Sequence, residues 1–392
     1  MLPPFFVSID LSRFPLLHQL NFFLWKYFLK FHRYFLGRRT GIHRDVSEEY
    51  HALTTALYWG RLFPVSIGRM RFALSQLSTW TTNEITSKTE RVAFDMKDRI
   101  VRDDAAPPQP TVVNAVYVHS GIHEITKEPR KVIFWLYGGA FLSGDIDGNV
   151  SPAERVGKQT GHDMFVANYR LLPEVEFDDM LWDVLLAYRY LVDIRKIAPK
   201  DITVWGISSG ASHCTRLLQL ISQVERNIPT SPTWLASLLR PTDMPASGVL
   251  LCPFVDYTEN TGSFTEYPKH DLVVNQSVIE EGVPYIAKVL GNGSRRRDCS
   301  PCYLDCTGLP PLCIVVSEHE AVYDHGVRLI NKARSQGVAV TVGLWKYMCH
   351  VFCLLDSFCP EGRQSNKFCC DWIIEQQQAK RRAQIVGQKT CD

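Results

Sequence analysis

The chain has 392 residues, of which 45% are hydrophobic and 21% charged, values typical of a globular protein with a large buried core. A formal net charge of +2 gives no basis for a nucleic-acid-binding surface, so nucleic acid is not an expected partner. All twelve cysteines follow position 213, in a chain too long for a small disulfide-stapled scaffold, and they do not suggest a disulfide framework.

Residues 1–85 are expected to form amphipathic or cap helices. The segment 14–36 is rich in Phe, Leu, Trp and Tyr, but Lys26, Lys30 and Arg33 make it a costly membrane span. Two interpretations stay open and can both hold: a basic, aromatic helix in contact with a membrane surface, and a cap helix over an apolar pocket. The protein is accordingly expected either on a membrane, such as that of the endoplasmic reticulum, or in the cytoplasm.

From residue 86 onward, strand and helix patterns alternate, which is typical of a mainly parallel sheet covered by helices on both faces. Apolar residues recur at helical spacing over residues 178–193, which predicts an amphipathic crossover helix. The alternation stops over residues 257–297, which we expect to form an inserted part of a cap. A closing helix is predicted after Phe368. The predicted strands are residues 91–95, 112–118, 132–137, 164–169, 202–205, 248–252, 312–316 and 338–344.

A candidate nucleophile stands at a strand-to-helix turn. The motif Gly206-Ile207-Ser208-Ser209-Gly210 follows the predicted strand 202–205 and precedes an apolar helical run. In that context a G-x-S-x-G motif forms an elbow that exposes the serine hydroxyl, and the helix N-terminus stabilises developing negative charge. The alternative is an ordinary turn rich in glycine and serine.

A glycine-rich loop follows an earlier predicted strand. The run Tyr137-Gly138-Gly139-Ala140-Phe141 offers small residues whose backbone N–H groups can turn inward. We expect the N–H groups of Gly138, Gly139 and Ala140, with that of Ser209, to form an oxyanion hole. An ordinary strand-ending turn is the alternative.

Serine requires a base, and the base requires a carboxylate that orients it. In hydrolases with such an elbow, the acid and then the histidine follow the serine along the chain. Glu320 follows the strand 312–316 and His350 follows the strand 338–344, so we predict a triad of Ser208, Glu320 and His350. Both predicted partners could instead be surface-loop residues, and they have rivals nearby: Glu318 and Asp324 for the acid, and His319 and His325 for the base.

Residues 132–352 resemble the hormone-sensitive-lipase-like branch of α/β hydrolases, the group that contains arylacetamide deacetylases and steryl acetyl hydrolases. The matching motifs are YRLLPE at 169–174, LLCPFVD at 250–256, the segment 320–326 aligned with the family's DPLxDxG, and CHVF at 349–352. The resemblance implies an α/β-hydrolase fold with a helical cap, and it favours Glu320 over Glu318 as the acid.

The chain departs from the family pattern at four positions. Tyr137 replaces the first residue of the family's HGGG, and Ala140 replaces its last glycine. Ile207 stands where the elbow usually has Asp, and Glu320 where the acid is usually Asp. Alanine keeps its N–H, and glutamate also serves as a triad acid. The loss of the histidine is expected to disturb the loop's hydrogen bonding and lower the rate.

These patterns predict cap helices over residues 1–85 and a catalytic domain over residues 86–392. The predicted activity is that of a serine carboxylesterase or deacetylase on short acyl, aryl, steryl or glycerolipid esters of apolar alcohols, with no cofactor. The alternative is a non-catalytic small-molecule receptor on the same scaffold. No metal is expected, because Cys299, Cys302 and Cys306 have only half of a zinc-binding pattern.

Overall fold

A computed structural model of the protein describes residues 46–51, 54, 66–72, 85–100, 107–126, 129–258, 262–269, 271–290 and 294–389. The predicted membrane-surface or cap helix at 14–36 lies outside these residues. Within the described residues, no helix is long and apolar enough to cross a membrane.

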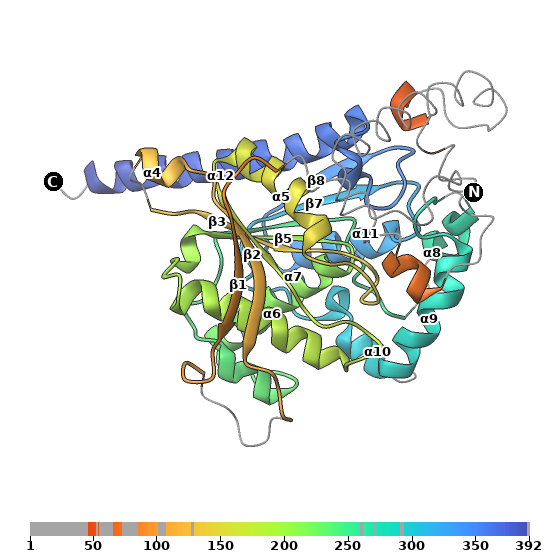
Figure 1. Ribbon diagram of the computed structural model, residues 1–392, viewed down its shortest axis with the longest axis horizontal. Coiled ribbons are helices and arrows are strands. Elements are labelled where there is room, and N and C mark those ends of the chain that lie inside the picture. Colours follow the sequence, from red (N-terminus) through yellow and green to blue (C-terminus); the bar gives the residue numbers. More distant parts are fainter. Residues whose placement is uncertain are drawn as a thin grey trace, which may run out of the picture.

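The centre of the molecule is an eight-stranded sheet with the strand order β1-β2-β4-β3-β5-β6-β7-β8 (Figure 1). Strand β2 pairs antiparallel with β1 and β4, and every other neighbouring pair is parallel. The mainly parallel sheet predicted from the sequence is therefore confirmed. The strands are β1 (Thr89–Asp95), β2 (Val112–Val118), β3 (Val132–Leu136), β4 (Asp163–Ala167), β5 (Ile202–Ile207), β6 (Ser247–Leu251), β7 (Leu312–Ser317) and β8 (Val340–Trp345).

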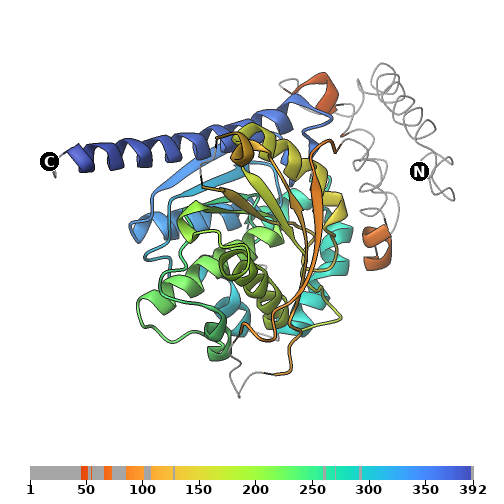
Figure 2. The ribbon, with the colours of Figure 1, turned by 60° about the vertical axis from the view of Figure 1, so that its left-hand side comes forward.

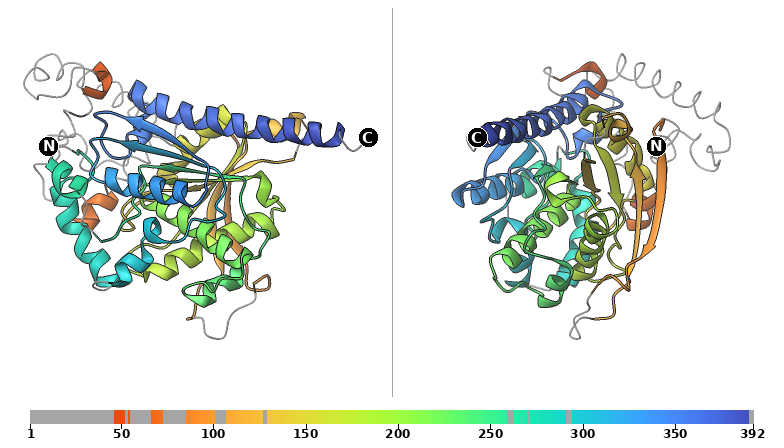
Figure 3. Two further views of the ribbon diagram at one scale, coloured as in Figure 1. Left: turned by 180° about the vertical axis from the view of Figure 1, so that it is seen from behind. Right: turned by 90° about the vertical axis from the view of Figure 1, so that its left-hand side faces the viewer.

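Helices cover both faces of the sheet, which explains why β3 to β7 consist of buried residues throughout. Helices α5 (Asp147–Thr160) and α12 (Pro360–Lys389) lie on one face, where α12 runs along the molecule and projects past it (Figures 1 and 2). Helices α6 (Phe177–Asp193), α7 (Ser209–Glu225) and α11 (Tyr323–Ser335) lie on the other face (Figure 3). Each face has its own cluster of buried apolar side chains.

Two helices differ from the sequence-based expectation. Helix α5 was not predicted, because its residues are largely polar and Pro152 lies inside it. Helix α12 begins at Pro360 rather than near Phe368. Proline suits a first helical position, and a Cβ at Gly362 would lie 2.8 Å from the Phe352 carbonyl oxygen, so close packing sets the start of this helix.

The stretch predicted as a cap insertion contains the helices α8 (Gly262–Glu266), α9 (Gln276–Leu290) and α10 (Ser294–Cys299). Beside α9 lies the helical segment 67–72, where the Ile67 N–H donates a hydrogen bond to Glu281 (3.3 Å). Arg71 of that segment donates to the carbonyl oxygens of Leu142 and Leu172, both at 2.7 Å. The division into cap and catalytic domain at residue 85 stays a prediction.

Candidate active site

Ser208 occupies a sharp turn between β5 and α7. Its backbone angles are φ 53° and ψ −118°, a conformation that residues other than glycine rarely adopt. A Cβ at Gly206 would lie 2.5 Å from the Cα of Ala211, and one at Gly210 would lie 2.2 Å from the Leu136 carbonyl oxygen. Only glycines therefore permit this turn, in which the serine side chain stands out from the strand end.

A chain of hydrogen bonds joins Ser208 to the two other residues of the predicted triad. The Oγ of Ser208 lies 2.8 Å from Nε2 of His350, and Nδ1 of His350 lies 2.7 Å from Oε2 of Glu320. The second carboxylate oxygen of Glu320 accepts the Ser317 N–H at 2.9 Å. The three side chains are almost entirely buried, with exposed fractions of 6% for Ser208, 3% for His350 and 0% for Glu320. The structure thus brings together three residues that lie far apart in the sequence.

The four rival residues make other contacts. Asp324 accepts the Ser263 N–H at 3.0 Å, and the Glu318 backbone N–H donates to the Trp345 carbonyl oxygen. His319 Nδ1 accepts the Tyr347 N–H at 3.2 Å. The ring of His325 stacks between two phenylalanine rings, and burial lowers its pKa below the usual range. These contacts tie loops and helices together and leave Glu320 and His350 as the pair adjoining Ser208.

The glycine-rich loop after β3 lies against the elbow. A Cβ at Gly138 would be 2.9 Å from the Cβ of Ser208 and 2.8 Å from the Ile207 carbonyl oxygen. Gly139, with φ 137°, and Ala140, with φ 55°, continue the loop in left-handed conformations. Ser209 follows Ser208 as the first residue of α7. The four expected oxyanion-hole residues therefore belong to two segments that are in contact beside the serine.

Tyr137, which stands in the place of the family histidine, anchors the start of this loop. Its hydroxyl donates to Oδ1 of Asn168 at 2.7 Å, and its ring stacks on Tyr169 with centroids 4.4 Å apart. The Tyr169 hydroxyl in turn donates to the Tyr137 carbonyl oxygen at 2.6 Å. Burial raises the pKa of Tyr137, so the hydroxyl stays a neutral donor. The loop is hydrogen-bonded despite the missing histidine.

A cluster of buried aromatic side chains packs against the glycine-rich loop. Phe141, from the glycine-rich loop, contacts the rings of Phe254, Tyr257 and His213. His213 is fully buried, and burial lowers its pKa to about 3, so this ring is neutral at physiological pH. Phe141, Phe254 and Tyr257 belong to the buried apolar core on the face of the sheet that α7 covers.

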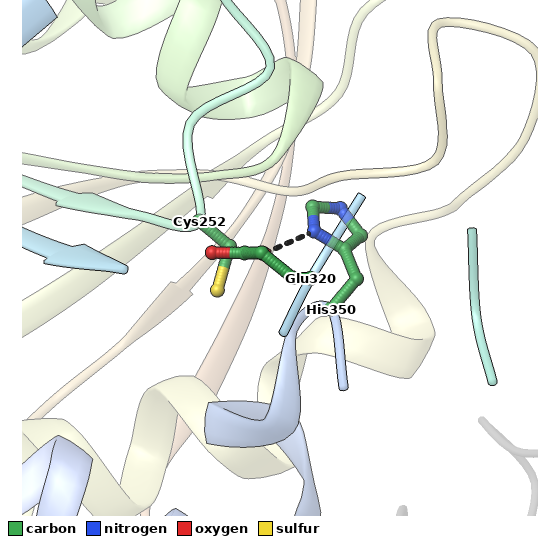
Figure 4. A group of neighbouring side chains, drawn as sticks. All are labelled: Cys252, Glu320 and His350. Carbon is green, nitrogen blue, oxygen red and sulfur yellow. Dashed lines mark hydrogen bonds and ion pairs between the residues drawn. The ribbon is translucent and has the colours of Figure 1, made fainter. Parts of the chain in front are cut away.

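Two residues beside the triad were not predicted as site residues. Asp271 accepts hydrogen bonds from the backbone N–H groups of Ala321 and His350, and no motif in the surrounding sequence indicates this role. Cys252 directly follows β6 with φ 47°, and its thiol lies next to the Glu320 carboxylate (Figure 4). Cys252 belongs to the LLCPFVD motif, but that motif does not indicate a contact with the acid.

The ligand atoms of Cys252, Glu320 and His350 lie within 4.8 Å of one another, a set that could hold a soft metal ion. The carboxylate and the imidazole already share a hydrogen bond of 2.7 Å, which an ion between them would break. Burial and then the Glu320 carboxylate raise the pKa of the Cys252 thiol, which opposes the thiolate form that a metal requires. These contacts therefore fit a hydrogen-bonded pair of Glu320 and His350 beside a protonated thiol better than a resident metal.

Comparisons with known proteins agree with this architecture. Residues 133–354, more than half of the chain, match the model of a family described by its alpha/beta hydrolase fold. An acetyl-hydrolase from Streptomyces hygroscopicus is 25% identical over 287 residues, which cover 73% of this chain and 89% of the relative. An esterase from Acinetobacter venetianus is 26% identical over 236 residues, which cover 60% and 72% respectively.

A crystal structure of an esterase from the bacterial hormone-sensitive lipase family has the same fold. Its TM-score is 0.66 at 23% sequence identity, with 84% of this chain and 98% of the other covered. The family model, the strand order and the serine elbow all indicate the same fold. The chain belongs to the family described by the α/β-hydrolase fold.

Proposed function

We propose that the protein is a serine carboxylesterase or deacetylase that works through a covalent acyl-enzyme. The observation that carries the proposal is the continuous hydrogen-bond chain from Ser208 through His350 to Glu320, with distances of 2.8 and 2.7 Å. A nucleophile that contacts a base, which in turn contacts a buried carboxylate, is the arrangement that acyl transfer by serine requires. The non-catalytic receptor is the alternative with which this proposal competes.

The proposed reaction has two halves. Ser208 Oγ attacks the ester carbonyl carbon while Nε2 of His350 takes the hydroxyl proton, and the imidazolium then gives that proton to the departing alkoxide. Water attacks the acyl-enzyme in the second half, with His350 again as base, and the carboxylic acid leaves. Glu320 stays ionised throughout and stabilises the imidazolium.

The oxyanion of each tetrahedral intermediate needs hydrogen-bond donors aimed at the position where charge develops. The proposed donors are the backbone N–H groups of Gly138, Gly139, Ala140 and Ser209. Their proximity to Ser208 supports this role, because Gly138 leaves no room for a Cβ between the loop and the elbow.

The proposed substrates are esters of apolar alcohols with short acyl groups, among them aryl, steryl and glycerolipid esters. Phe141 of the glycine-rich loop packs on Phe254, Tyr257 and a neutral His213, so the interior next to the loop is apolar, and this supports an apolar substrate. The relative named acetyl-hydrolase supports a short acyl group. Contact of segment 14–36 with a membrane remains a separate prediction, made from the sequence alone.

Active-site labelling tests the proposal directly. A fluorophosphonate probe should label the wild-type protein, and the label should be lost in Ser208→Ala. Ser335→Ala is the matched control, because this hydroxyl donates to the Lys332 carbonyl oxygen on α11. A wild-type protein that neither takes the label nor hydrolyses p-nitrophenyl acetate would refute the proposal, and tight binding of an apolar ligand without turnover would favour the receptor.

A further inference from the structure

We propose that Asp271 is a positioning residue that holds the loop of the triad acid and the loop of the triad base at a fixed separation. This inference rests on the proposed function, because it assigns Asp271 a task in the same reaction. Asp271 acts through the backbone of neighbouring residues.

One carboxylate bridges the two loops. Oδ2 of Asp271 accepts the N–H of Ala321, the residue after Glu320, at 2.9 Å. Oδ1 accepts the N–H of His350 itself at 3.2 Å. The first loop follows β7 and the second follows β8, whereas Asp271 comes from the inserted stretch between α8 and α9. The distance between these two backbone positions therefore depends on a third segment of the chain.

Asp271 is itself held firmly. It is 1% exposed, and Oδ1 also accepts the N–H groups of Val273 at 2.9 Å and Val274 at 3.2 Å. Its own backbone N–H donates to the Tyr267 carbonyl oxygen at 2.7 Å. Four N–H donors thus stabilise a buried carboxylate, which would otherwise be expensive to remove from water.

The turn that carries His350 has two further attachments. The Tyr50 hydroxyl accepts the Cys349 N–H at 2.6 Å, and Oγ of Ser317 donates to the Met348 carbonyl oxygen at 2.7 Å. These contacts hold residues 348 and 349, whereas Asp271 holds the backbone of the base. Ser317 also links this turn to the acid, because its N–H donates to Glu320, and Asp271 adds a second link that binds the backbone N–H of His350 itself.

Asparagine at position 271 would break this bridge with almost no change in size. Both oxygens of the aspartate accept from N–H groups, but an asparagine has one oxygen and one NH₂ group. Whichever way the amide is turned, an NH₂ group faces an N–H on one of the two loops. A misplacement of about 1 Å in a catalytic group can cost roughly 100-fold in rate.

The experiment compares Asp271→Asn with Asp324→Asn, each assayed per active site titrated with a fluorophosphonate. Asp324 is the matched control, because it also accepts a backbone N–H across the insertion, from Ser263, without contacting His350. We expect kcat of Asp271→Asn to fall by about 10- to 100-fold, with KM within about threefold. The kcat for ethyl acetate should fall more than the kcat for p-nitrophenyl acetate, because a poor leaving group depends more on the proton that His350 delivers. Asp324→Asn should stay within about twofold.

Asp271→Ser provides a second variant, since a serine hydroxyl can keep the local turn to the Val273 N–H but is too short to bridge both loops. If either variant folds and has the wild-type kcat per labelled site with both esters, Asp271 is a structural residue and the inference is overturned. The inference is also overturned if the hydrolysis rates of both esters fall by the same factor and that factor equals the fall in the number of labelled sites. A wild-type protein that neither labels nor turns over would remove the proposed function itself, which is a different outcome.

Discussion

At Ser208 the φ of 53° stores backbone strain that the surrounding contacts must balance. The Ser208 N–H donates to the Leu251 carbonyl oxygen at 2.9 Å, and the Ser208 carbonyl oxygen accepts the Phe254 N–H at 3.2 Å. Both partners belong to the end of β6 and the residues after it. The position of the nucleophile therefore depends on a neighbouring strand as well as on its own turn.

Neutralising Glu320 or Glu318, the two glutamates of the loop after β7, should have very different effects on kcat. Glu320→Gln removes the charge that stabilises the imidazolium of His350, and kcat should fall by about two to four orders of magnitude with folding intact. Glu318→Gln should stay within a few-fold, because Glu318 is tied to Trp345 through its backbone N–H. The kcat of each variant is measured as ester hydrolysis under saturating substrate, and circular dichroism checks that both variants fold. Swapped results would mean that Glu318 is the acid.

At the scale of secondary-structure elements, the register of β3 and β5 places the loop after β3 in contact with the Ser208 elbow. The β3–β5 pairing runs from Val132 opposite Ile202 to Leu136 opposite Gly206, so both strands end at the same level. The loop after one strand therefore meets the turn after the other. Parallel pairing in register is what places the proposed oxyanion donors next to the nucleophile.

Adding a methyl group at Gly138 should disrupt that contact. In Gly138→Ala the Cβ would lie 2.8 Å from the Ile207 carbonyl oxygen, so the loop must move, and kcat should fall by about 100- to 1,000-fold. Gly337→Ala is the control, because Gly337 has a φ of 81° but no atom within 4 Å of an added Cβ. That variant should lose about 1 kcal/mol of unfolding free energy and keep its activity. Equal kcat in the two variants, measured per labelled site, would speak against the proposed oxyanion loop.

On the scale of the whole molecule, the described N-terminal residues attach to distant parts of the structure. Ser47 binds Glu361 at the start of α12 through its N–H and its hydroxyl, at 2.6 and 2.7 Å. Tyr50 reaches the turn before His350, and Arg71 reaches the loop after β3 through the Leu142 carbonyl oxygen. The N-terminal segment thus contacts both loops on which the proposed chemistry depends.

Arg71 should stabilise the fold more through carbonyl oxygens than through its ion pair. Arg71→Ala leaves the carbonyl oxygens of Leu142 and Leu172 without these donors, and we expect a loss of about 1–3 kcal/mol in unfolding free energy. Glu174→Gln removes only an exposed ion pair of 2.7 Å and should cost less than about 1 kcal/mol. Urea unfolding of both variants measures the difference. A larger loss for Glu174→Gln would show that the ion pair is the main attachment.

The sequence by itself determined the sheet and the candidate residues. Each of the eight strands lies within about two residues of its predicted bounds. For β3 to β7 the reason is that a strand buried on both faces must be an apolar run between turns. The elbow was predictable because its close packing requires glycines two residues before and two residues after Ser208, and these form the G-x-S-x-G motif. The order of acid and base along the chain indicated Glu320 and His350. Their proximity is now a structural fact, while their catalytic roles remain proposals.

The features that only the tertiary structure decided are those that depend on contacts between distant segments: helix α5, the start of α12, and the contacts of Asp271 and Tyr50. Helix α5 is largely polar in sequence and buries its apolar side chains against the sheet and α12, and α12 begins where Gly362 packs against the turn at Phe352. Asp271 and Tyr50 lie 79 and 299 residues from their partners at His350 and Cys349. A hydrogen bond to a backbone N–H places no requirement on the partner's side chain, so no local motif can record it.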